Sequence, residues 1–274
     1  MTSGRTSVVP KLVAFDMDGT LLGESLVVRP RVVEAIANMQ SEGIEGCIVT
    51  GRMYRSVLPY VRELHFHAPV VCYQGAAVID PTNDMVILHT PLPNAAAVDV
   101  VRYAHDHSLH VQLYANDRFY VEQLNAYAEL YASISGIQPE LVTSLAAAFD
   151  GRDSTKAVII ADASVAAEHL PKVRAFLGDR AYVTRSLPEF IEIMNPNVDK
   201  GRALALVAQR VGITMDEVVA IGDSWNDAPL LRAAGFAIAM GSAPEELKSI
   251  ADVVVGDVDS DGVAEALERY VLSG

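Results

Sequence analysis

Residues 11–20 read KLVAFDMDGT, and this stretch decides the fold. Its first five residues form a short, mostly apolar run, which is typical of a strand buried in a parallel sheet. Two carboxylates, Asp16 and Asp18, and a glycine-containing turn follow directly. In open α/β sheets, the site lies at the carboxyl ends of the strands. The stretch therefore predicts a buried first strand that ends in a functional loop.

Strand-like runs alternate with helical stripes along both ends of the chain. The segment from Pro30 to Gly43 has apolar residues at helical spacing, and residues 46–49 (GCIV) read as a second strand. The further elements expected are helices near 54–64, 226–233, 244–250 and 261–271, one helix ending at Gly212, and strands near 69–73, 218–221, 236–240 and 252–255. This alternation predicts an α/β fold, an open parallel sheet with helices on both faces.

The middle of the chain has a different pattern, a helix followed by a hairpin, and the pattern occurs twice. The first copy is a helix at 94–107 and two alternating stretches, 109–115 and 118–123, around Asn116 and Asp117. The second copy is a helix at 163–177 and strands at 181–185 and 189–194 around Leu187 and Pro188. We therefore expect a catalytic core formed by residues 1–89 and 189–274, with an α+β domain inserted at 90–188.

The composition excludes several classes of protein. Apolar residues make up 51% of the 274 positions and charged residues 20%, which excludes a disordered chain. Thirty-five acids against 21 Lys and Arg residues give a net charge of −14. This field repels nucleic acid and anionic membranes, so neither is expected as a partner.

Two cysteines and the N-terminal sequence bear on location. Cys47 and Cys72 both lie in apolar stretches, as reduced thiols of a cytoplasmic protein would. Lys11 and Asp16 interrupt the first apolar run, so no secretory signal is expected. Residues 64–79 are too polar to span a bilayer. The oligomeric state does not follow from the sequence, and a monomer fits it.

Polar clusters follow several of the expected strands, and folding should bring them to one edge of the sheet. They are Asp16 and Asp18 after the first strand, Thr50 after the second, Asp223, Asn226 and Asp227 after 218–221, and Lys200 at a helix start. Converging carboxylates repel one another unless a cation joins them, and oxygen ligands suit Mg²⁺. With Lys200, such a cation would attract a phosphate dianion into an acidic protein. Asp16 could then attack phosphorus, and Asp18 could serve as acid and base.

Four short motifs resemble those of the haloacid dehalogenase superfamily, in order. They are DMDGT at 16–20, VTGR at 49–52, DKG at 199–201 and GDSWND at 222–227. The spacing is similar to that of the Cof-type phosphatases, whose cap is inserted between the second and third motifs. The resemblance covers the whole chain and implies a Rossmann-like core with an inserted α+β cap.

The resemblance also implies roles for the motif residues. Asp16 would be the nucleophile that forms an aspartyl-phosphate, and Asp18 the general acid and base. Mg²⁺ would bind Asp16, the backbone carbonyl of Asp18, and Asp223. Thr50 would donate a hydrogen bond to the phosphoryl group, and Asn226 would contact the phosphate. Lys200 would neutralise the negative charge of the phosphoryl oxygens and of Asp16, and Asp227 would support the metal. The loop of Thr50, Gly51 and Arg52 would bind the substrate. Arg52 could instead tie the core to the cap.

Some positions depart from the family or stay open. The chain has Tyr73-Gln74-Gly75 where relatives commonly have Asn before Gly, and Asn195-Pro196-Asn197 where relatives often have a glycine. Trp225 could pack under the cap or contact the substrate. No motif names the substrate, and we expect specificity in the cap loops 116–119 and 184–189.

The leading hypothesis is a Mg²⁺-dependent phosphatase acting on a small phosphorylated metabolite. A phosphomutase would use the same aspartyl-phosphate but exclude water. Haloalkanoate dehalogenation is disfavoured by Asp18, which that chemistry does not need. The alternative that is not an enzyme is a protein that binds a phosphorylated ligand without turning it over. The intact pair of Asp16 and Asp18 disfavours this alternative.

Two further patterns resemble metal sites. Residues 257–268 satisfy the calcium-loop pattern of an EF-hand, but a strand-like run precedes them where an entering helix is required. Asp261 is expected to cap the last helix instead. His105, His107 and His110 are expected to be solvated, since positions 105 and 107 do not share a helix face.

Overall fold

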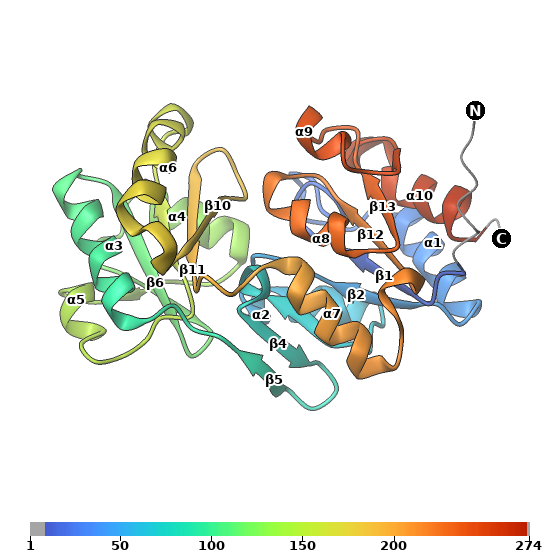
Figure 1. Ribbon diagram of the computed structural model, residues 1–274, viewed down its shortest axis with the longest axis horizontal. Helices are drawn as coiled ribbons and strands as arrows, with labels where there is room; N and C mark the ends of the chain where they lie inside the picture. The colour runs from blue at the N-terminus through green and yellow to red at the C-terminus, as the bar shows by residue number, and fades with distance from the viewer. Residues whose placement is uncertain (1–8, 273–274) are drawn as a thin grey trace.

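The computed structural model describes residues 9–272, which form two lobes connected by two chain segments (Figure 1). The core lobe contains a five-stranded parallel sheet in the order β14-β13-β12-β1-β2. Its strands are β1 (Leu12–Phe15), β2 (Glu45–Ile48), β12 (Val218–Gly222), β13 (Phe236–Ala239) and β14 (Val253–Val254). Its helices are α1 (Pro30–Ser41), α2 (Tyr54–Glu63), α7 (Lys200–Val211), α8 (Ala228–Ala233), α9 (Glu245–Lys248) and α10 (Gly262–Tyr270). The predicted parallel sheet is confirmed.

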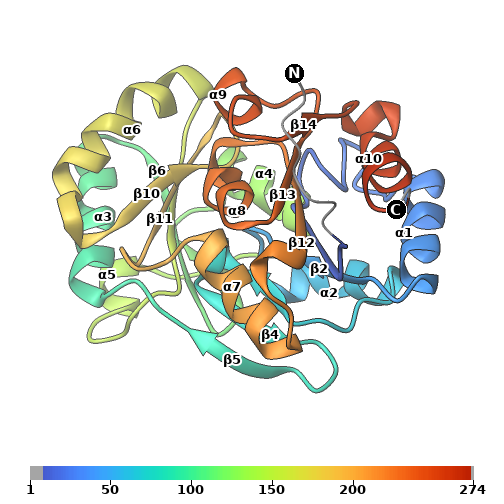
Figure 2. The same cartoon turned by 45° about the vertical axis from the view of Figure 1, so that its right-hand side comes forward.

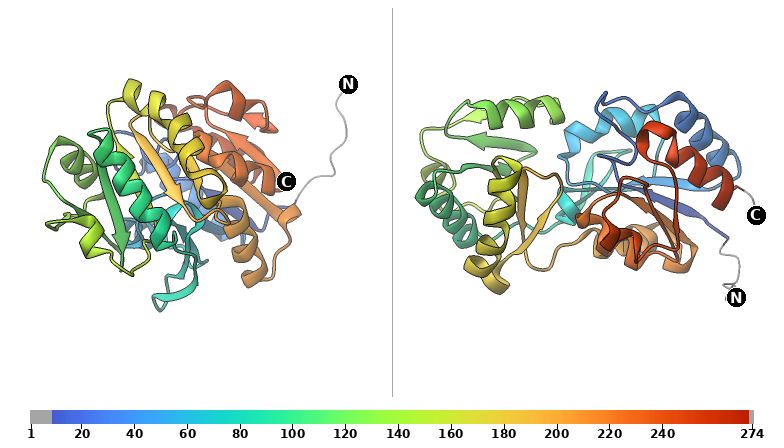
Figure 3. Two further views of the ribbon diagram at one scale, coloured as in Figure 1. Left: turned by 60° about the vertical axis from the view of Figure 1, so that its left-hand side comes forward. Right: turned by 90° about the horizontal axis from the view of Figure 1, so that it is seen from above.

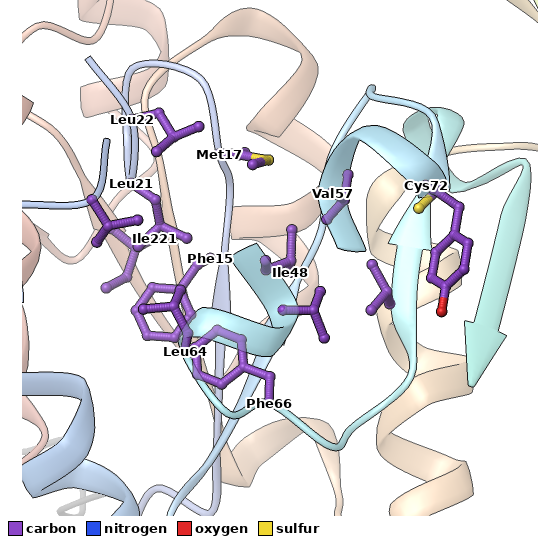
Figure 4. Close-up of a cluster of buried hydrophobic side chains, with 14 of the residues drawn as sticks. Phe15, Met17, Leu21, Leu22, Ile48, Val57, Leu64, Phe66, Cys72 and Ile221 are labelled. Atoms are coloured by element: carbon purple, nitrogen blue, oxygen red, sulfur yellow. The ribbon is translucent and has the colours of Figure 1, made fainter. Parts of the chain in front are cut away.

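Strand β1 lies between β12 and β2 and is fully buried. Because side chains alternate along a strand, Val13 and Phe15 pack with α1, α2 and α10, whereas Leu12 and Ala14 pack with α7 and α8. Figure 4 shows Phe15 beside Phe66, and the two rings stack with centroids 5.7 Å apart. Burial on both faces explains why KLVAF lacks polar alternation.

A small antiparallel sheet extends the core: its first strand was predicted near residues 69–73, but its two further strands were not. It consists of β3 (Val70–Cys72), β4 (Ala77–Asp80) and β5 (Met85–His89). A parallel bridge between Val49 and Val71 places β3 beside the end of β2. The turn between β3 and β4, η1 (Tyr73–Gly75), therefore lies next to the loop that follows β2.

The second lobe, which we call the cap, contains a six-stranded sheet in the order β10-β11-β9-β6-β7-β8. Its strands are β6 (His110–Ala115), β7 (Arg118–Val121), β8 (Glu140–Leu141), β9 (Ala157–Ile160), β10 (Tyr182–Arg185) and β11 (Phe190–Met194). Its helices are α3 (Asn94–Asp106), α4 (Ala126–Ser135), α5 (Leu145–Ala148) and α6 (Ala163–Leu177). Both predicted hairpins are present, but α4, α5, β8 and β9 were not predicted.

The domain boundary expected at residue 188 is wrong by one strand. Strand β11 pairs with both β9 and β10, so the cap sheet extends to Met194. Its Ile191 and Ile193 pack under α3 and α6, on the face turned away from the core, as Figures 2 and 3 show for the helices. Phe190 and Met194 belong to the hydrophobic cluster that continues into the core lobe.

The two chain segments that connect the lobes lie side by side. Asn195 donates a hydrogen bond from Nδ2 to the carbonyl of Pro91, at 2.9 Å. A bridge between Leu92 and Ser154 fixes the first segment against the cap. The cap is thus inserted at neighbouring points of the core.

Several smaller predictions can now be compared with the structure. Cys47 and Cys72 are free and buried. Within residues 9–272, no helix is long and apolar enough to cross a membrane. The N-terminal segment in which we expected no secretory signal includes residues 1–8, which lie outside the described residues.

The two patterns that resembled metal sites consist of residues with protein partners of their own. In the 257–268 segment, Asp257 accepts hydrogen bonds from Ser260, and Asp261 and Glu268 pair with arginines of the α1 region. Asp261 is the N-cap residue of α10, as expected, but its side chain makes no capping hydrogen bond. His110 is buried and not solvated, because its ring packs near Tyr127.

Candidate active site

Three carboxylates converge where the loops after β1 and β12 meet. Asp16, Asp223 and Asp227 can each place an oxygen within 4.8 Å of the others. The two strands pair in parallel up to Phe15 and Ile221, so the loops that follow start side by side. These three residues thus lie together at the carboxyl edge of the sheet, where the sequence predicted that polar clusters would meet.

Gly19 allows the two loops to approach so closely. It has a φ of +88°, and a Cβ atom at this position would collide with the Asp223 carboxylate. The next residue, Thr20, donates a hydrogen bond from its hydroxyl to Asp223 Oδ1, at 2.8 Å. The glycine and the threonine of the DMDGT motif therefore position a carboxylate of the fourth motif.

Lys200 is the first residue of α7, where a cation opposes the helix dipole. Its side chain is only 1% exposed and donates hydrogen bonds to Asp16 Oδ1 and to Asp227 Oδ1, the latter at 2.5 Å. Asp199 caps the same helix by accepting from the backbone of Arg202. The two carboxylates supply the reason for a buried lysine at this position.

Asp227 is fully buried and serves several partners at once. Its Oδ1 binds Lys200, and its Oδ2 accepts from the backbone N–H groups of Asp223 and Ser224, each at 3.0 Å. These contacts close the turn η4 (Trp225–Asp227) and hold the loop that carries Asp223. Because protein groups already occupy both oxygens, Asp227 is better suited to support the cluster than to be a primary ligand.

The electrostatics of the cluster show a shortage of positive charge. Burial, together with the negative charge of Asp227, raises the pKa of Asp16 to about 7 in spite of Lys200. Burial and the charge of Asp16 raise the pKa of Asp223 well above its ordinary value. Burial alone would lower the pKa of Lys200, but Asp16 and Asp227 raise it. One lysine does not balance three carboxylates, and a further cation would.

Asp18 lies at the same loop but outside this cluster. Arg52 binds its carboxylate with Nε, at 3.1 and 2.9 Å from Oδ1 and Oδ2, and with Nη2, at 2.5 Å from Oδ1. The arginine side chain is 6% exposed and that of Asp18 is 32% exposed. Thr50 accepts from the backbone of Arg52 at 3.2 Å, so the 50–52 loop holds the arginine under Asp18.

Asn226 faces the same cavity and pairs with an amide that we did not assign to the site. Its Nδ2 donates to Gln74 Oε1 at 3.0 Å, while Gln74 Nε2 and Asn226 Oδ1 are buried without a hydrogen-bond partner. Gln74 has a φ of +60°, and its backbone N–H binds the carbonyl of Thr50. The Tyr73-Gln74-Gly75 departure was the only sequence signal for this residue.

A cavity of about 40 Å³ joins the core residues to the cap. Asp16, Asp18 and the loop of Thr50, Gly51 and Arg52 line it, together with Ser224 and Asn226. The cap contributes Tyr131, Ile134, Ser135, Lys156, Ser186, Leu187, Phe190 and Glu192. Of these cap residues, only Ser186 and Leu187 lie in a loop where we expected specificity.

The other loop, 116–119, does not line the cavity. Asp117 instead accepts hydrogen bonds from the backbone N–H groups of Tyr54 and Arg55, at 3.0 and 2.8 Å, and from the hydroxyl of Tyr73 at 2.6 Å. A carboxylate of the cap thus occupies the N-terminus of a core helix, α2, where the helix dipole favours negative charge.

Trp225 also joins the lobes. The guanidinium of Arg185 lies over its ring, 3.9 Å from the centroid, and Ser224 donates to the carbonyl of Ser186 at 2.9 Å. Trp225 does not line the cavity in this structure. The hairpin β10–β11 therefore rests on the loop that holds Asp223.

Comparison with known proteins decides the family. Residues 13–267 match the model of the haloacid dehalogenase-like hydrolases. The chain belongs to this family. The resemblance noted in the sequence motifs is confirmed.

The relatives span the whole chain. It is 26% identical to the pyridoxal phosphate phosphatase YbhA of Escherichia coli, over 96% of this chain and 99% of that protein. It is 27% identical to the 5-amino-6-(5-phospho-D-ribitylamino)uracil phosphatase YitU of Bacillus subtilis, over 95% and 97%. A haloacid dehalogenase-like hydrolase from Bacteroides thetaiotaomicron has the same fold, with a TM-score of 0.84, 28% identity, and coverage of 95% and 99%. The chain is therefore an enzyme of this hydrolase family.

Proposed function

We propose that the protein is a phosphatase that hydrolyses small phosphorylated metabolites through a phosphoryl group carried on Asp16. One observation carries the proposal: Asp16 faces the cavity between the lobes while Lys200 holds its Oδ1. No hydrogen bond joins Oδ2 of Asp16 to another described residue, so this oxygen is available to attack phosphorus. The phosphatase names of the relatives support the same conclusion.

The reaction would proceed in two halves. In the first, Asp16 attacks phosphorus, the bond between phosphorus and the leaving oxygen breaks, and Asp18, which must enter this step as the protonated acid, gives its proton to that oxygen. In the second, Asp18 takes a proton from water, which attacks the phosphorylated Asp16 and releases phosphate. Arg52 would hold the Asp18 carboxylate near the leaving oxygen, and Lys200 would neutralise charge on Asp16.

The carboxylate cluster also fits Mg²⁺, which the family implies. Asp16 and Asp223 offer oxygen donors, and the raised pKa values of both support a cation that would relieve their repulsion. Asp227 would support Asp223 and Lys200 through the contacts described above. When bound, Mg²⁺ would neutralise the oxygens of the phosphoryl group.

The cap would cover the substrate and select its leaving group. We place this domain at residues 90–194, since β11 belongs to its sheet. Residues of both lobes line the cavity, so movement of the cap would let the substrate enter. Thr50, Gly51 and Asn226 lie on the core wall of the cavity, where they would contact the phosphoryl group.

The test measures hydrolysis of p-nitrophenyl phosphate and of a sugar phosphate in ¹⁸O-labelled water. Asp16→Asn should lower kcat by at least about 10³, the order of loss when a nucleophile is removed. Asp80→Asn, which changes a core carboxylate outside the site, should leave kcat unchanged. More than a tenth of wild-type activity in Asp16→Asn would refute the nucleophile. An isomerised sugar phosphate without labelled phosphate would show a phosphomutase.

A further inference from the structure

A buried ion pair, Lys156 with Glu192, forms part of the cap wall of the cavity. Side chains alternate along β9 and β11, and the residues next to this pair on the same faces are Val158 and Phe190, which pack toward the core. Lys156 and Glu192 thus occupy positions that pattern alone would assign to apolar side chains. Both side chains are at most 3% exposed.

Each member of the pair is saturated by protein groups. Lys156 Nζ donates to Glu192 Oε2 at 2.7 Å and to the carbonyl of Gly51 at 2.9 Å, and it lies 4.8 Å from the centroid of the Tyr114 ring. Glu192 Oε1 accepts from the hydroxyl of Ser186 at 2.8 Å. The lysine therefore has no free bond to offer an anion in the closed protein.

The charges around the cavity leave no unpaired cation for a leaving group. Five charged residues line it: Asp16, Asp18, Arg52, Lys156 and Glu192. Arg52 is bound to Asp18, and Lys156 is bound to Glu192. The rest of the cap wall is mostly apolar or aromatic, with Tyr131, Ile134 and Phe190. A carboxylate placed there would lie near Glu192 in a site of low dielectric constant.

We infer that the Lys156–Glu192 pair selects substrates whose leaving group is uncharged, and rejects those that carry a carboxylate or a second phosphate beside the scissile one. The inference rests on the proposed phosphatase function and specifies its substrate class. A lone lysine at position 156 would attract an anionic leaving group. Glu192 cancels that attraction.

The experiment compares two substrates that differ mainly in one charge, glycerol 3-phosphate and 3-phosphoglycerate. The wild-type enzyme should favour glycerol 3-phosphate at least about tenfold in kcat/KM. The reason is that the carboxylate of 3-phosphoglycerate would be buried near Glu192 without a cation to pair with it. Glu192→Gln should lower this ratio at least about tenfold, because Lys156 is then unpaired. Both compounds are also measured as competitive inhibitors of p-nitrophenyl phosphate hydrolysis. If neither compound is hydrolysed, the ratio of their Ki values gives the preference instead of kcat/KM.

Two further variants separate charge from structure. The double variant Lys156→Met with Glu192→Gln has an uncharged wall and should return to the wild-type ratio. Glu168→Gln removes an exposed acid of the cap helix α6 that pairs with Lys172 and does not line the cavity, and it should leave the ratio unchanged. If Glu192→Gln fails to fold, Lys156→Met takes its place, since it leaves Glu192 unpaired and should raise the preference for glycerol 3-phosphate.

The outcomes distinguish this inference from the proposed function. A wild-type preference for 3-phosphoglycerate, or no preference, overturns the inference while hydrolysis itself stands. The inference also fails if Glu192→Gln changes kcat/KM for both substrates equally, or if Glu168→Gln shifts the ratio as much. If no phosphate ester is hydrolysed at all, the proposed function fails first.

Discussion

The core and the cap each bury a cluster of charged side chains at the cavity, but the two clusters differ in balance. In the core, Lys200 faces three carboxylates, and the pKa values of Asp16 and Asp223 are raised. In the cap, Lys156 and Glu192 match one to one. The unbalanced, negative cluster attracts a cation, which in turn can attract a phosphoryl group, whereas the balanced pair attracts neither. On our two proposals, chemistry and substrate selection lie on opposite walls of the cavity.

Removal of divalent cations should have the largest effect and should act on the core alone. EDTA should reduce turnover at least about 10³-fold, since Asp16 and Asp223 would then repel the phosphate, and excess Mg²⁺ should restore it. The ratio between glycerol 3-phosphate and 3-phosphoglycerate should be the same before and after this cycle. Full activity in excess chelator would refute the metal requirement.

Asp18→Asn should have the next largest effect, and its size should depend on the leaving group. An alkyl phosphate needs a proton on its leaving oxygen, so its kcat/KM should fall about 10²-fold or more. The loss for p-nitrophenyl phosphate should be about tenfold smaller, because its leaving group needs little protonation. Measurement of kcat/KM for both substrates checks this. Equal losses would mean that Asp18 is not the general acid.

Asp117→Asn tests the contact between the lobes and should have a moderate effect. It weakens the bonds to Tyr54, Arg55 and Tyr73 that hold the cap closed. We expect kcat/KM to fall about fivefold, with a loss of stability of about 1 kcal/mol, as for a helix cap.

The matched control is Asp153→Asn, which removes a carboxylate that binds the first residue of α3 entirely within the cap. Thermal unfolding should shift comparably in both variants, but only Asp117→Asn should change the kinetics. A kinetic loss of equal size in the control would show that general destabilisation, and not closure, is responsible.

The smallest effect is the pH dependence of stability in the metal-free protein. Because folding raises the pKa of Asp16 to about 7, its contribution to stability is full below pH about 4 and is lost as the pH rises through 7. Wild-type Tm should therefore fall relative to Asp16→Asn between pH 5 and 8, by roughly a few degrees. Mg²⁺ should abolish this difference. A difference that does not vary with pH would contradict the charge imbalance.

The core cluster and the cap cluster also differ in how far the sequence predicts them. Asp16, Lys200 and Asp223 lie in short motifs directly after strands or at a helix start, where contiguous residues determine the geometry. The parallel core sheet and both cap hairpins were likewise predicted from local patterns. Their positions therefore required no knowledge of distant contacts.

Residues of the cap wall could not be found in this way. Lys156 and Glu192 are 36 positions apart and meet only because β9 pairs with β11. Tyr131 lies on α4, a helix that we did not predict. Asp117 stands in a predicted turn, but its partners belong to the other lobe. Such contacts depend on sheet register and lobe packing, which local sequence does not specify.

The paired connecting segments have a consequence for evolution and engineering. The bond between Asn195 and Pro91 keeps the two ends of the cap adjacent, and chains accept insertions best where both ends meet. The cap can therefore be cut out and replaced as one module without rebuilding the sheet beneath it. Grafting residues 92–194 onto another member of the family should transfer preference for a leaving group while the recipient keeps its own reaction chemistry.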